Sequence, residues 1–520
     1  MEKLWQNALS IRESYVILPL FFKDECKNSF YITGKKGMFK VKGREVKKRW
    51  IVLFAALATI CGLGLGASPR EGLFEMTNES LWANVAWMIT ATIFVLMMTP
   101  GLSFFYGGMV RAKNVISTML QSFIVMGVVS VIWVVFGFGL AFGNDVLHII
   151  GNPADFFMFD NVGMTNVTAS ESERVAMEQL NEIGFATTTI PLALFALFQM
   201  KFAIITPSLI TGSFAERVRF SGYLFFMIFW VILVYCPLAH CTWHPKGLFA
   251  MMHVHDFAGG IVVHAASGVA ALAGALFLGR RSATEGSKPA NVPFVLLGAA
   301  MLWLGWFGFN GGSSLAADGV AILAFLNTNT AAAIAMVSWV VFDCLRGHKP
   351  SALGAAIGAV VGLVAITPCA GWVTVGQSMF IAFVTTLCCY TAVTWKNSRQ
   401  SFDDALDVFP THGLGGIIGT VFTGIFAYGY FAKDEPDFIS HTEFFWNHIL
   451  AILIVMAYTF VMSYGLYWLT DKMIPMRVSR RSEQIGLDRS QHDEEYSTEV
   501  TTELAEEITP EQWLKSVEEN

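Results

Sequence analysis

The chain has little charge, and this scarcity is its most informative property. Asp, Glu, Lys and Arg together make up 14% of the 520 residues, whereas a soluble protein carries about a quarter. Hydrophobic residues make up 54%. This composition excludes a string of soluble domains and predicts an all-α polytopic membrane protein.

Cysteine is also scarce: there are eight residues, and no two of them form a C-x-x-C pair. Several stand inside apolar runs, such as Cys236, Cys388 and Cys389, so we expect buried thiols and no disulfide framework. No segment resembles a nucleic-acid-binding module, a hydrolase or a redox centre. The sequence therefore predicts a protein that is not an enzyme, uses no cofactor and binds no nucleic acid.

The N-terminal section, residues 1–67, differs from the rest. Lys47, Lys48 and Arg49 precede an apolar run over 50–65, which ends in small residues at Gly66 and Ala67. A basic start, an apolar run and a small-residue exit are typical of a cleaved signal peptide. An additional, uncleaved helix is the alternative. Met38 would place a signal peptide of ordinary length at the N-terminus.

Apolar segments long enough to span a bilayer begin near residue 82. We count eleven of them, over 82–105, 115–142, 188–212, 219–243, 257–279, 291–312, 318–345, 352–369, 371–395, 411–432 and 443–470. They define a membrane domain over 68–475. Residues 476–520 would form an acidic, partly disordered cytoplasmic tail with a regulatory role.

Basic residues occur in alternate loops, which predicts the orientation. One side carries Arg111, Arg217, Arg281, Arg346 and Lys396, and the other carries the Ser/Thr/Glu-rich loop 143–187 and the acidic loop 433–442. The cytoplasmic side is the basic one. The N-terminus would be external after signal cleavage and the C-terminus cytoplasmic, in the cell (inner) membrane.

Two histidines lie in similar settings about 150 residues apart. His264 ends the run Asp256-Phe-Ala-Gly-Gly-Ile-Val-Val-His, and His412 follows Asp407-Val-Phe-Pro-Thr. They fall at the starts of spans five and ten. Spans 1–5 and 6–10 would then be two inverted five-helix repeats, with the eleventh helix as an extra one. In that arrangement the two histidines converge near the middle of the membrane.

An ionisable side chain at membrane depth is costly, so it indicates a transport path or a proton relay. A structural hydrogen bond between helices is the alternative for each histidine. Because imidazole donates through one nitrogen and accepts through the other, two facing rings can share a proton. Such a pair would leave one donor and one acceptor for a small polar molecule.

A second group of polar residues lies near the end of span four. His240 and His244 are four residues apart, with Cys236, Cys241, His253 and His255 nearby, which resembles a metal site. However, Pro245 and Gly247 break the helix there, and we assign no metal. Phe198 and Phe202 share a helix face. Such aromatic stripes usually belong to the core or to the lipid-facing surface; binding of an ammonium-type cation is the alternative, and spacing alone does not decide between them.

Several motifs together resemble the ammonium transporter (Amt/Mep/Rh) family, in its Amt/Mep branch and bacterial type. They occur in the family's order from about Trp82 to Tyr496. They are Phe104-Phe-Tyr-Gly-Gly-Met-Val-Arg111, Phe214-Ala-Glu-Arg-Val-Arg-Phe220, Asp256 to His264, Gly305-Trp-Phe-Gly-Phe-Asn310 and Asp407 to Gly413.

This resemblance implies a homotrimer with one pore in each subunit. It implies an outer recruitment site for ammonium at Phe198, Trp243 and Ser313, with Asp256 close by. It further implies a gate formed by Phe202 and Phe309, and pore histidines at His264 and His412. By family analogy a P-II-type nitrogen regulatory protein would bind at the cytoplasmic face.

Three features depart from the family pattern. Lys201 stands between Phe198 and Phe202, where an uncharged residue is expected. Asp493 stands in the tail where a glycine is usual. Residues 497–520 extend beyond the family pattern.

Four hypotheses remain at this point. The leading one is electrogenic ammonium transport for nitrogen uptake. The others are an electroneutral ammonia channel, an ammonium sensor that signals through the tail, and a membrane metalloenzyme that uses the His240–His255 group.

Overall fold

The computed structural model describes residues 82–160, 162–163, 190–282, 288–399, 402–433 and 438–496, the backbone of 79–81, and short pieces before residue 60. The predicted signal peptide and residues 497–520 fall almost wholly outside these ranges. The domain boundaries at residues 67 and 475 stay predictions.

Residues 1–70 form a unit of their own. Four short strands pair in it as an antiparallel sheet in the order β1-β2-β3-β4. Their bounds are Tyr15–Val16, Tyr31–Lys35, Met38–Val41 and Arg44–Lys47.

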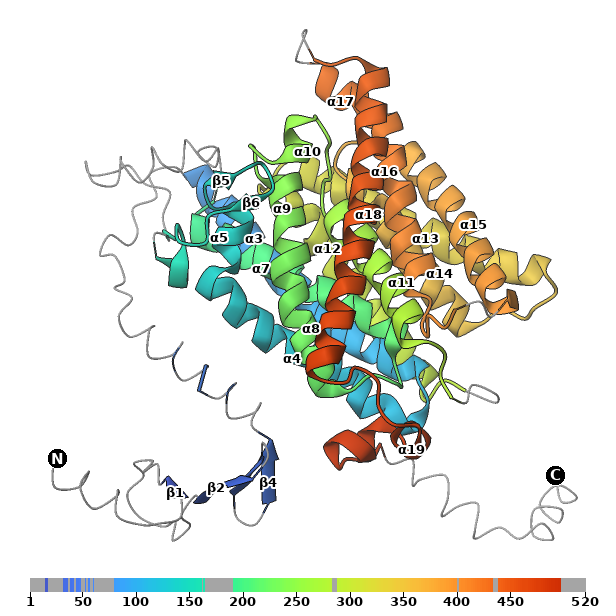
Figure 1. Ribbon diagram of the computed structural model, residues 1–520. Helices are drawn as coiled ribbons and strands as arrows, with labels where there is room; N and C mark the ends of the chain where they lie inside the picture. The colour runs from blue at the N-terminus through green and yellow to red at the C-terminus, as the bar shows by residue number, and fades with distance from the viewer. Residues whose placement is uncertain are drawn as a thin grey trace, which may run out of the picture. The chain divides into compact units, whose positions relative to one another are not determined.

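The second unit spans residues 71–520, and its described residues form a bundle of long helices (Figure 1). Eleven helices among the described residues are long and apolar enough to cross a membrane, which confirms the predicted fold class. They run over Trp82–Met109, Ala112–Phe142, Leu192–Phe214, Phe220–Met251, Gly260–Leu278, Val292–Ser314, Gly319–Leu345, Ala352–Cys369, Val375–Ser398, Phe409–Ala432 and His441–Met473.

Most spans are built from one long helix with a short turn at one end. The long helices are α3 (Glu79–Met109), α4 (Val115–Ile132), α7 (Leu192–Ile210), α8 (Phe220–Trp230), α11 (Ala266–Leu278), α12 (Val292–Gly311), α13 (Gly319–Leu345), α14 (Ala352–Ile366), α15 (Val375–Arg399), α16 (Leu414–Phe426) and α18 (His441–Met473). The shorter helices are α5 (Phe138–Phe142), α9 (Cys236–Trp243), α10 (Leu248–Met251), α17 (Tyr428–Ala432) and α19 (Arg480–Ile485).

The remaining elements are short turns and one hairpin. The π-helical turns are η2 (Trp133–Gly137), η5 (Val231–Tyr235), η6 (Gly260–Ala265), η9 (Phe409–Gly413) and η10 (Asp488–His492). The 3-10 turns are η1 (Ala112–Asn114), η3 (Phe157–Phe159), η4 (Thr211–Phe214), η7 (Gly312–Ser314) and η8 (Thr367–Cys369). Strands β5 (Asp145–Val146) and β6 (Ile150–Gly151) form the hairpin.

The two five-helix halves pack in matching ways. Helix α3 packs along α12, the first helix of each half, and the α3–α7 contact has its counterpart in α12–α14. The fifth helices of the halves cross where Gly268 meets Gly413, because a side chain at Gly268 would collide with the Gly413 backbone. Since each half has an odd number of spans, the second runs inverted relative to the first, as predicted.

Both fifth helices begin with a π-helical turn, and each turn carries one of the two histidines. His264 lies in η6 and His412 in η9. Gly259 precedes η6 with a φ of +111°, which a residue with a side chain rarely adopts. The symmetry inferred from the Asp–His spacing is therefore present in the backbone. A π turn is a common device at functional sites.

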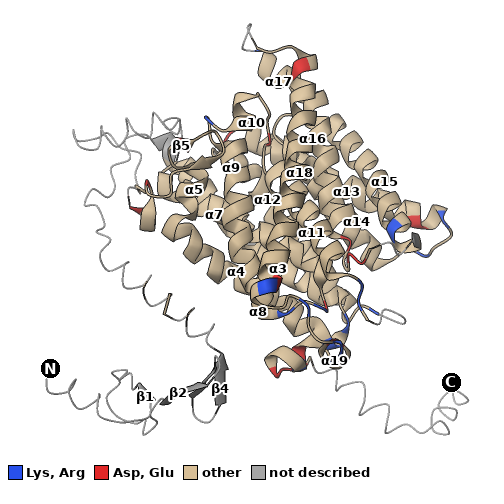
Figure 2. Ribbon diagram, in the orientation of Figure 1, with Lys and Arg blue, Asp and Glu red and all other residues tan. Residues whose placement is uncertain are grey.

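The two ends of the bundle differ in charge. We call the end that carries α19 the charged end, and the opposite end, with α10 and α17, the aromatic end (Figure 1). Figure 2 shows Lys and Arg gathered around α8 and α19, with a second group beside α14 and α15.

The C-terminal segment 476–496 folds against the charged end. The Asp488 carboxylate accepts hydrogen bonds from the backbone N–H groups of Ile116 (3.0 Å) and Ser117 (2.7 Å), at the start of α4. Asp493 has a φ of +59°. Aspartate tolerates this left-handed conformation better than most residues, which explains how it replaces the glycine expected there.

Candidate functional site

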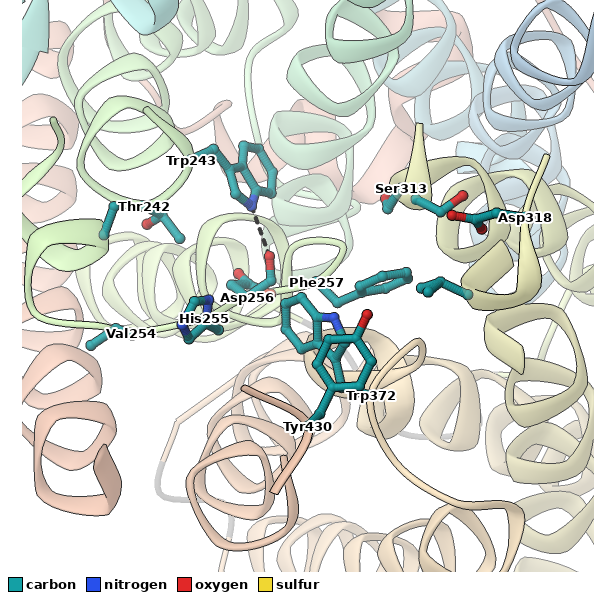
Figure 3. A pocket seen from close by; sticks show the side chains of 13 residues that line it. Thr242, Trp243, Val254, His255, Asp256, Phe257, Ser313, Asp318, Trp372 and Tyr430 are labelled. Carbon is teal, nitrogen blue, oxygen red and sulfur yellow. Dashed lines mark hydrogen bonds between the residues drawn. The ribbon is translucent and has the colours of Figure 1, made fainter. Parts of the chain in front are cut away.

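The aromatic end contains a wide pocket of about 460 Å³ (Figure 3). Its walls combine aromatic rings with hydroxyl groups and two aspartates, the exposed Asp318 and the buried Asp256. Burial, and then the neighbouring His448 and His253, lower the pKa of His255 to about 3, so its ring is neutral. The residues around the pocket are Thr242, Trp243, Ala250, Val254, His255, Asp256, Phe257, Ser313, Ser314, Asp318, Val320, Trp372 and Tyr430.

A smaller cavity of about 160 Å³ shares three of these residues, Trp243, Phe257 and Ser313. Phe198, Phe202 and Gln199 line it as well. The structure thus brings the three predicted recruitment residues, Phe198, Trp243 and Ser313, to one cavity. A cation in this cavity would face aromatic rings, which attract it by cation–π interaction. It would also face the hydroxyl oxygen of Ser313.

Asp256 stabilises the residues that form this cavity. Its carboxylate accepts four backbone N–H hydrogen bonds, from Gly259 and Gly260 (2.9 and 2.7 Å) and from Ile261 and Val262 (2.7 and 3.2 Å). Its carbonyl oxygen accepts a hydrogen bond from Trp243 Nε1 at 2.9 Å (Figure 3). Burial raises the pKa of Asp256, and the four N–H groups oppose that rise. Asp256 therefore orients both Trp243 and the turn that carries His264.

Two stacked phenylalanines lie beyond the cavity. The rings of Phe202 and Phe309 have centroids 4.2 Å apart and an interplanar angle of 24°. Phe202 also contacts Phe198 and Trp243 edge-on, at 4.9 and 5.9 Å. Ser313 donates its hydroxyl hydrogen to the Phe309 carbonyl (2.8 Å). Because rings stacked this closely leave no room for a water file, at least one must move before a molecule can pass.

The two histidines lie directly behind the phenylalanines. His264 is 5.9 Å from Phe309 and 5.5 Å from His412, measured between ring centroids. The Nδ1 atoms of the two histidines are 3.4 Å apart. His264 Nε2 is buried without a hydrogen-bond partner among the described residues. A buried imidazole nitrogen with no partner is costly, and it can accept or donate a hydrogen bond to a passing molecule.

Trp306 completes this site, and sequence reasoning assigned it no role. Its ring stacks on His264 at 5.2 Å, and its Nε1 donates to Thr367 Oγ1 at 2.9 Å. The sequence could have indicated this position, because Trp306 precedes Phe309 by three residues and so lies on the same helix face. Trp372 and Tyr430 of the wide pocket were also missed, because they come from segments far apart in the sequence. His255 was considered only as part of a possible metal site.

Below the histidines lies a small cavity of about 10 Å³, lined by His412, Thr411, Tyr106 and Leu406 among others. That volume holds about one water molecule. The order from the aromatic end is therefore wide pocket, aromatic cavity, stacked phenylalanines, paired histidines and inner cavity.

An ion-pair network surrounds the charged end. Glu216, 1% exposed, binds Arg111 and Arg281, each at 2.9 Å. Arg281 also makes a two-pronged pair with Asp403, with both N–O distances 2.9 Å. Burial alone would raise the pKa of Glu216, but Arg111 and Arg281 outweigh it and hold that pKa below its usual value. The same balance lowers the pKa of Asp403 to about 2.

The His240 group has other partners. The His240 ring stacks on His244 at 4.3 Å, its Nε2 lies 2.9 Å from Asp145 Oδ1, and its Nδ1 lies 3.0 Å from the Ala141 oxygen. Helix α9 ends at Trp243, before Pro245, as predicted. Among the described residues, no cluster of three or more His, Cys, Asp or Glu is placed to hold a metal.

Comparison with known proteins gives one family. Residues 86–496 match the Ammonium Transporter Family. The chain is 40% identical to the ammonium transporter of Bacillus subtilis over 415 residues, 79% of this chain and 97% of that protein.

Solved structures agree. Saccharomyces cerevisiae Mep2 is 31% identical, with a TM-score of 0.66, over 76% of this chain and 88% of that one. A Sensor Amt Protein is 29% identical, with a TM-score of 0.70, over 80% of this chain and all of that one. The family is one of transporters and not of enzymes. The chain is a multi-pass membrane protein that belongs to the ammonium transporter family.

Proposed function

We propose that the protein moves ammonium across the membrane through the path described above. The observation that carries this proposal is the buried pair His264 and His412 behind the stacked rings of Phe202 and Phe309. Ammonium would bind at Phe198, Trp243 and Ser313. It would pass the phenylalanine gate and reach the histidines as ammonia, with or without its proton.

The chemistry of the path favours ammonium over potassium. The two cations are similar in size, but only ammonium donates hydrogen bonds and can give up a proton. Cation–π attraction at the aromatic cavity recruits either ion weakly. The buried histidine nitrogens then distinguish them, because a neutral imidazole can hydrogen-bond to ammonia and offers potassium too little to replace its water.

The paired histidines would act as one unit. If one Nδ1 donates to the other across 3.4 Å, the first ring presents Nε2 as an acceptor and the second presents Nε2–H as a donor. Ammonia both donates and accepts, so it fits between such groups. Burial disfavours a charged pair, which keeps the site suited to a neutral cargo.

The orientation and assembly are part of the proposal. The aromatic end would face outward and the charged end the cytoplasm of the cell (inner) membrane, following the basic loops. The N-terminus would be external after removal of a signal peptide. A homotrimer is proposed from the family resemblance, with a P-II-type regulatory protein as partner at the charged end. Native mass spectrometry in detergent would test for three copies.

The test combines two measurements on proteoliposomes. Solid-supported-membrane current after an ammonium jump reports charge, and an internal pH dye reports ammonia entry. We expect the wild type to give a fast internal pH change, with or without current, and the double variant His264→Ala/His412→Ala to lose it. A double variant as active as the wild type would refute the twin-histidine path.

An ammonium sensor is the second candidate. Two observations favour it: the tail is bound to the charged end through Asp488, and the fold resembles a Sensor Amt Protein. Ammonium binding by calorimetry without either current or pH change would support the sensor over the transporter.

A further inference from the structure

Lys201 is a buried lysine in the middle of α7, the helix that supplies Phe198 and Phe202. Its side chain is 8% exposed. Among the described residues, its Nζ donates one hydrogen bond, to the sulfur of Met200 at 3.7 Å. Such a contact compensates little of the cost of placing an ammonium group at membrane depth.

In the part of the chain that the structure describes, the membrane-spanning elements that pack on α7 offer no carboxylate to Lys201. Helix α7 contacts α3, α4 and α11 and the turns η4, η5 and η6. From Trp82 to Phe142, Leu192 to Phe214, Phe220 to Met251 and Gly260 to Leu278, the sequence contains no Asp or Glu. By contrast, the buried Lys396 at the charged end lies 2.5 Å from Asp407 Oδ1. Lys201 has no such carboxylate partner within the described ranges.

Lys201 is close enough to the path to act on it through its charge. It directly precedes Phe202 and follows Phe198 by three residues, so all three lie within about one helical turn. From the spacing of adjacent Cα atoms and the length of a lysine side chain, we place its Nζ roughly 10 Å from the gate. The side chain leaves the helix on its flank, roughly 100° away from Phe202, so it need not block the path.

We propose that Lys201 is a selectivity-determining residue that suppresses the passage of charged ammonium while neutral ammonia still passes. This inference rests on the proposed transport function and specifies which species, ammonia or ammonium, passes the phenylalanine gate. A fixed positive charge about 10 Å away, in surroundings of low polarity, repels a cation in the gate. Ammonia carries no charge and feels no such repulsion. The protein would then move more ammonia per unit of charge than a chain with a neutral residue at this position.

The experiment measures both fluxes in proteoliposomes for four proteins. They are the wild type, Lys201→Met, Lys201→Arg and Lys246→Met; Lys246 is exposed at the end of α9 and serves as the matched control. The quantity compared is the ratio of ammonium-jump current to ammonia-driven internal pH change. We expect this ratio to rise about tenfold in Lys201→Met and to stay at the wild-type value in Lys201→Arg and Lys246→Met.

Each outcome bears on the inference. An unchanged ratio in Lys201→Met, with pH change intact, would overturn it and leave the proposed function standing. A rise in Lys201→Arg equal to that in Lys201→Met would overturn it too, since charge would then not be the cause. If Lys201→Met does not fold, Lys201→Gln must give the same rise. No ammonia flux in any of the proteins would overturn the proposed function and this inference with it.

Discussion

The aromatic and charged ends of the membrane domain are built on opposite principles. The aromatic end is open, with about 460 Å³ of pocket among rings, hydroxyl groups and a neutral histidine. The charged end is filled by Glu216, Arg111, Arg281 and Asp403, and its cavity beside His412 is about 10 Å³. Under the proposed function, the residues that bind ammonium and the residues that stabilise the fold lie at different ends of the path. We expect variants at the charged end to change stability first and those at the aromatic end to change affinity first.

The largest expected effect is at Glu216. Replacing it with Gln leaves the guanidinium groups of Arg111 and Arg281 without their shared carboxylate. Breaking a buried ion pair on one side costs about 3–5 kcal/mol, so the melting temperature in detergent should fall steeply. The control Glu443→Gln changes an exposed carboxylate on α18 and should melt like the wild type. A Glu216→Gln protein with wild-type melting would contradict the bracing role.

Asp256 is an exception to this division, because it lies at the aromatic end and yet stabilises the fold. In Asp256→Asn the side chain loses its charge and one of its two acceptor oxygens, leaving two of the four N–H groups without a partner. Hydrogen bonds to a charged group contribute about 1.5–3 kcal/mol, so we expect a loss of stability in that range. Thermal unfolding measures it. If ammonium affinity alone changed, with no loss of stability, Asp256 would be a binding residue and not a brace.

Acid should weaken the charged end. The pKa of Asp403 is about 2 in the folded protein and roughly 3.9 when unfolded. Because the folded pKa is depressed, the stabilisation is present above the unfolded pKa and is lost as pH falls toward 2. The difference corresponds to about 2.6 kcal/mol. Melting temperatures between pH 5 and pH 2 should drop less in Asp403→Asn than in the wild type; equal slopes would exclude Asp403 as the cause.

The smallest effect belongs to the aromatic cavity. In Trp243→Leu the cavity loses its indole, and cation–π attraction contributes about 1 kcal/mol, so half-saturation of transport should need roughly 5 to 10 times more ammonium. Trp446→Leu, which alters an exposed ring on α18, is the control. If Trp243→Leu kept wild-type affinity but changed the melting temperature, the aromatic end would contribute to stability and not to binding, contrary to the proposal.

The sequence predicted the architecture well, because apolar runs and basic loops reflect the membrane directly. The eleven helices followed from the apolar runs, and the inverted halves and the approach of His264 to His412 followed from the spacing of the two Asp–His motifs. The helix ends were less exact: span nine begins at Val375, and residues 371–374 belong to the preceding turn.

The rest depended on contacts between segments far apart in the chain. Trp372 and Tyr430 join His255 at one pocket only after the fold brings three loops together. Likewise, the sequence offered no reason to join Glu216 to Arg281, 65 residues away. Local patterns predict spans and turns, whereas a pocket wall or an ion-pair network is set by packing.

The carboxylate of Asp256 has a consequence for dynamics. It holds the N–H groups of four consecutive residues, Gly259 to Val262, at the start of a helix where such groups usually face water. Deuterium would therefore enter these amides only when their hydrogen bonds to the Asp256 carboxylate break. Their hydrogen-exchange rate therefore measures how often the hydrogen bonds that hold the turn carrying His264 break. It can be measured without ammonium present.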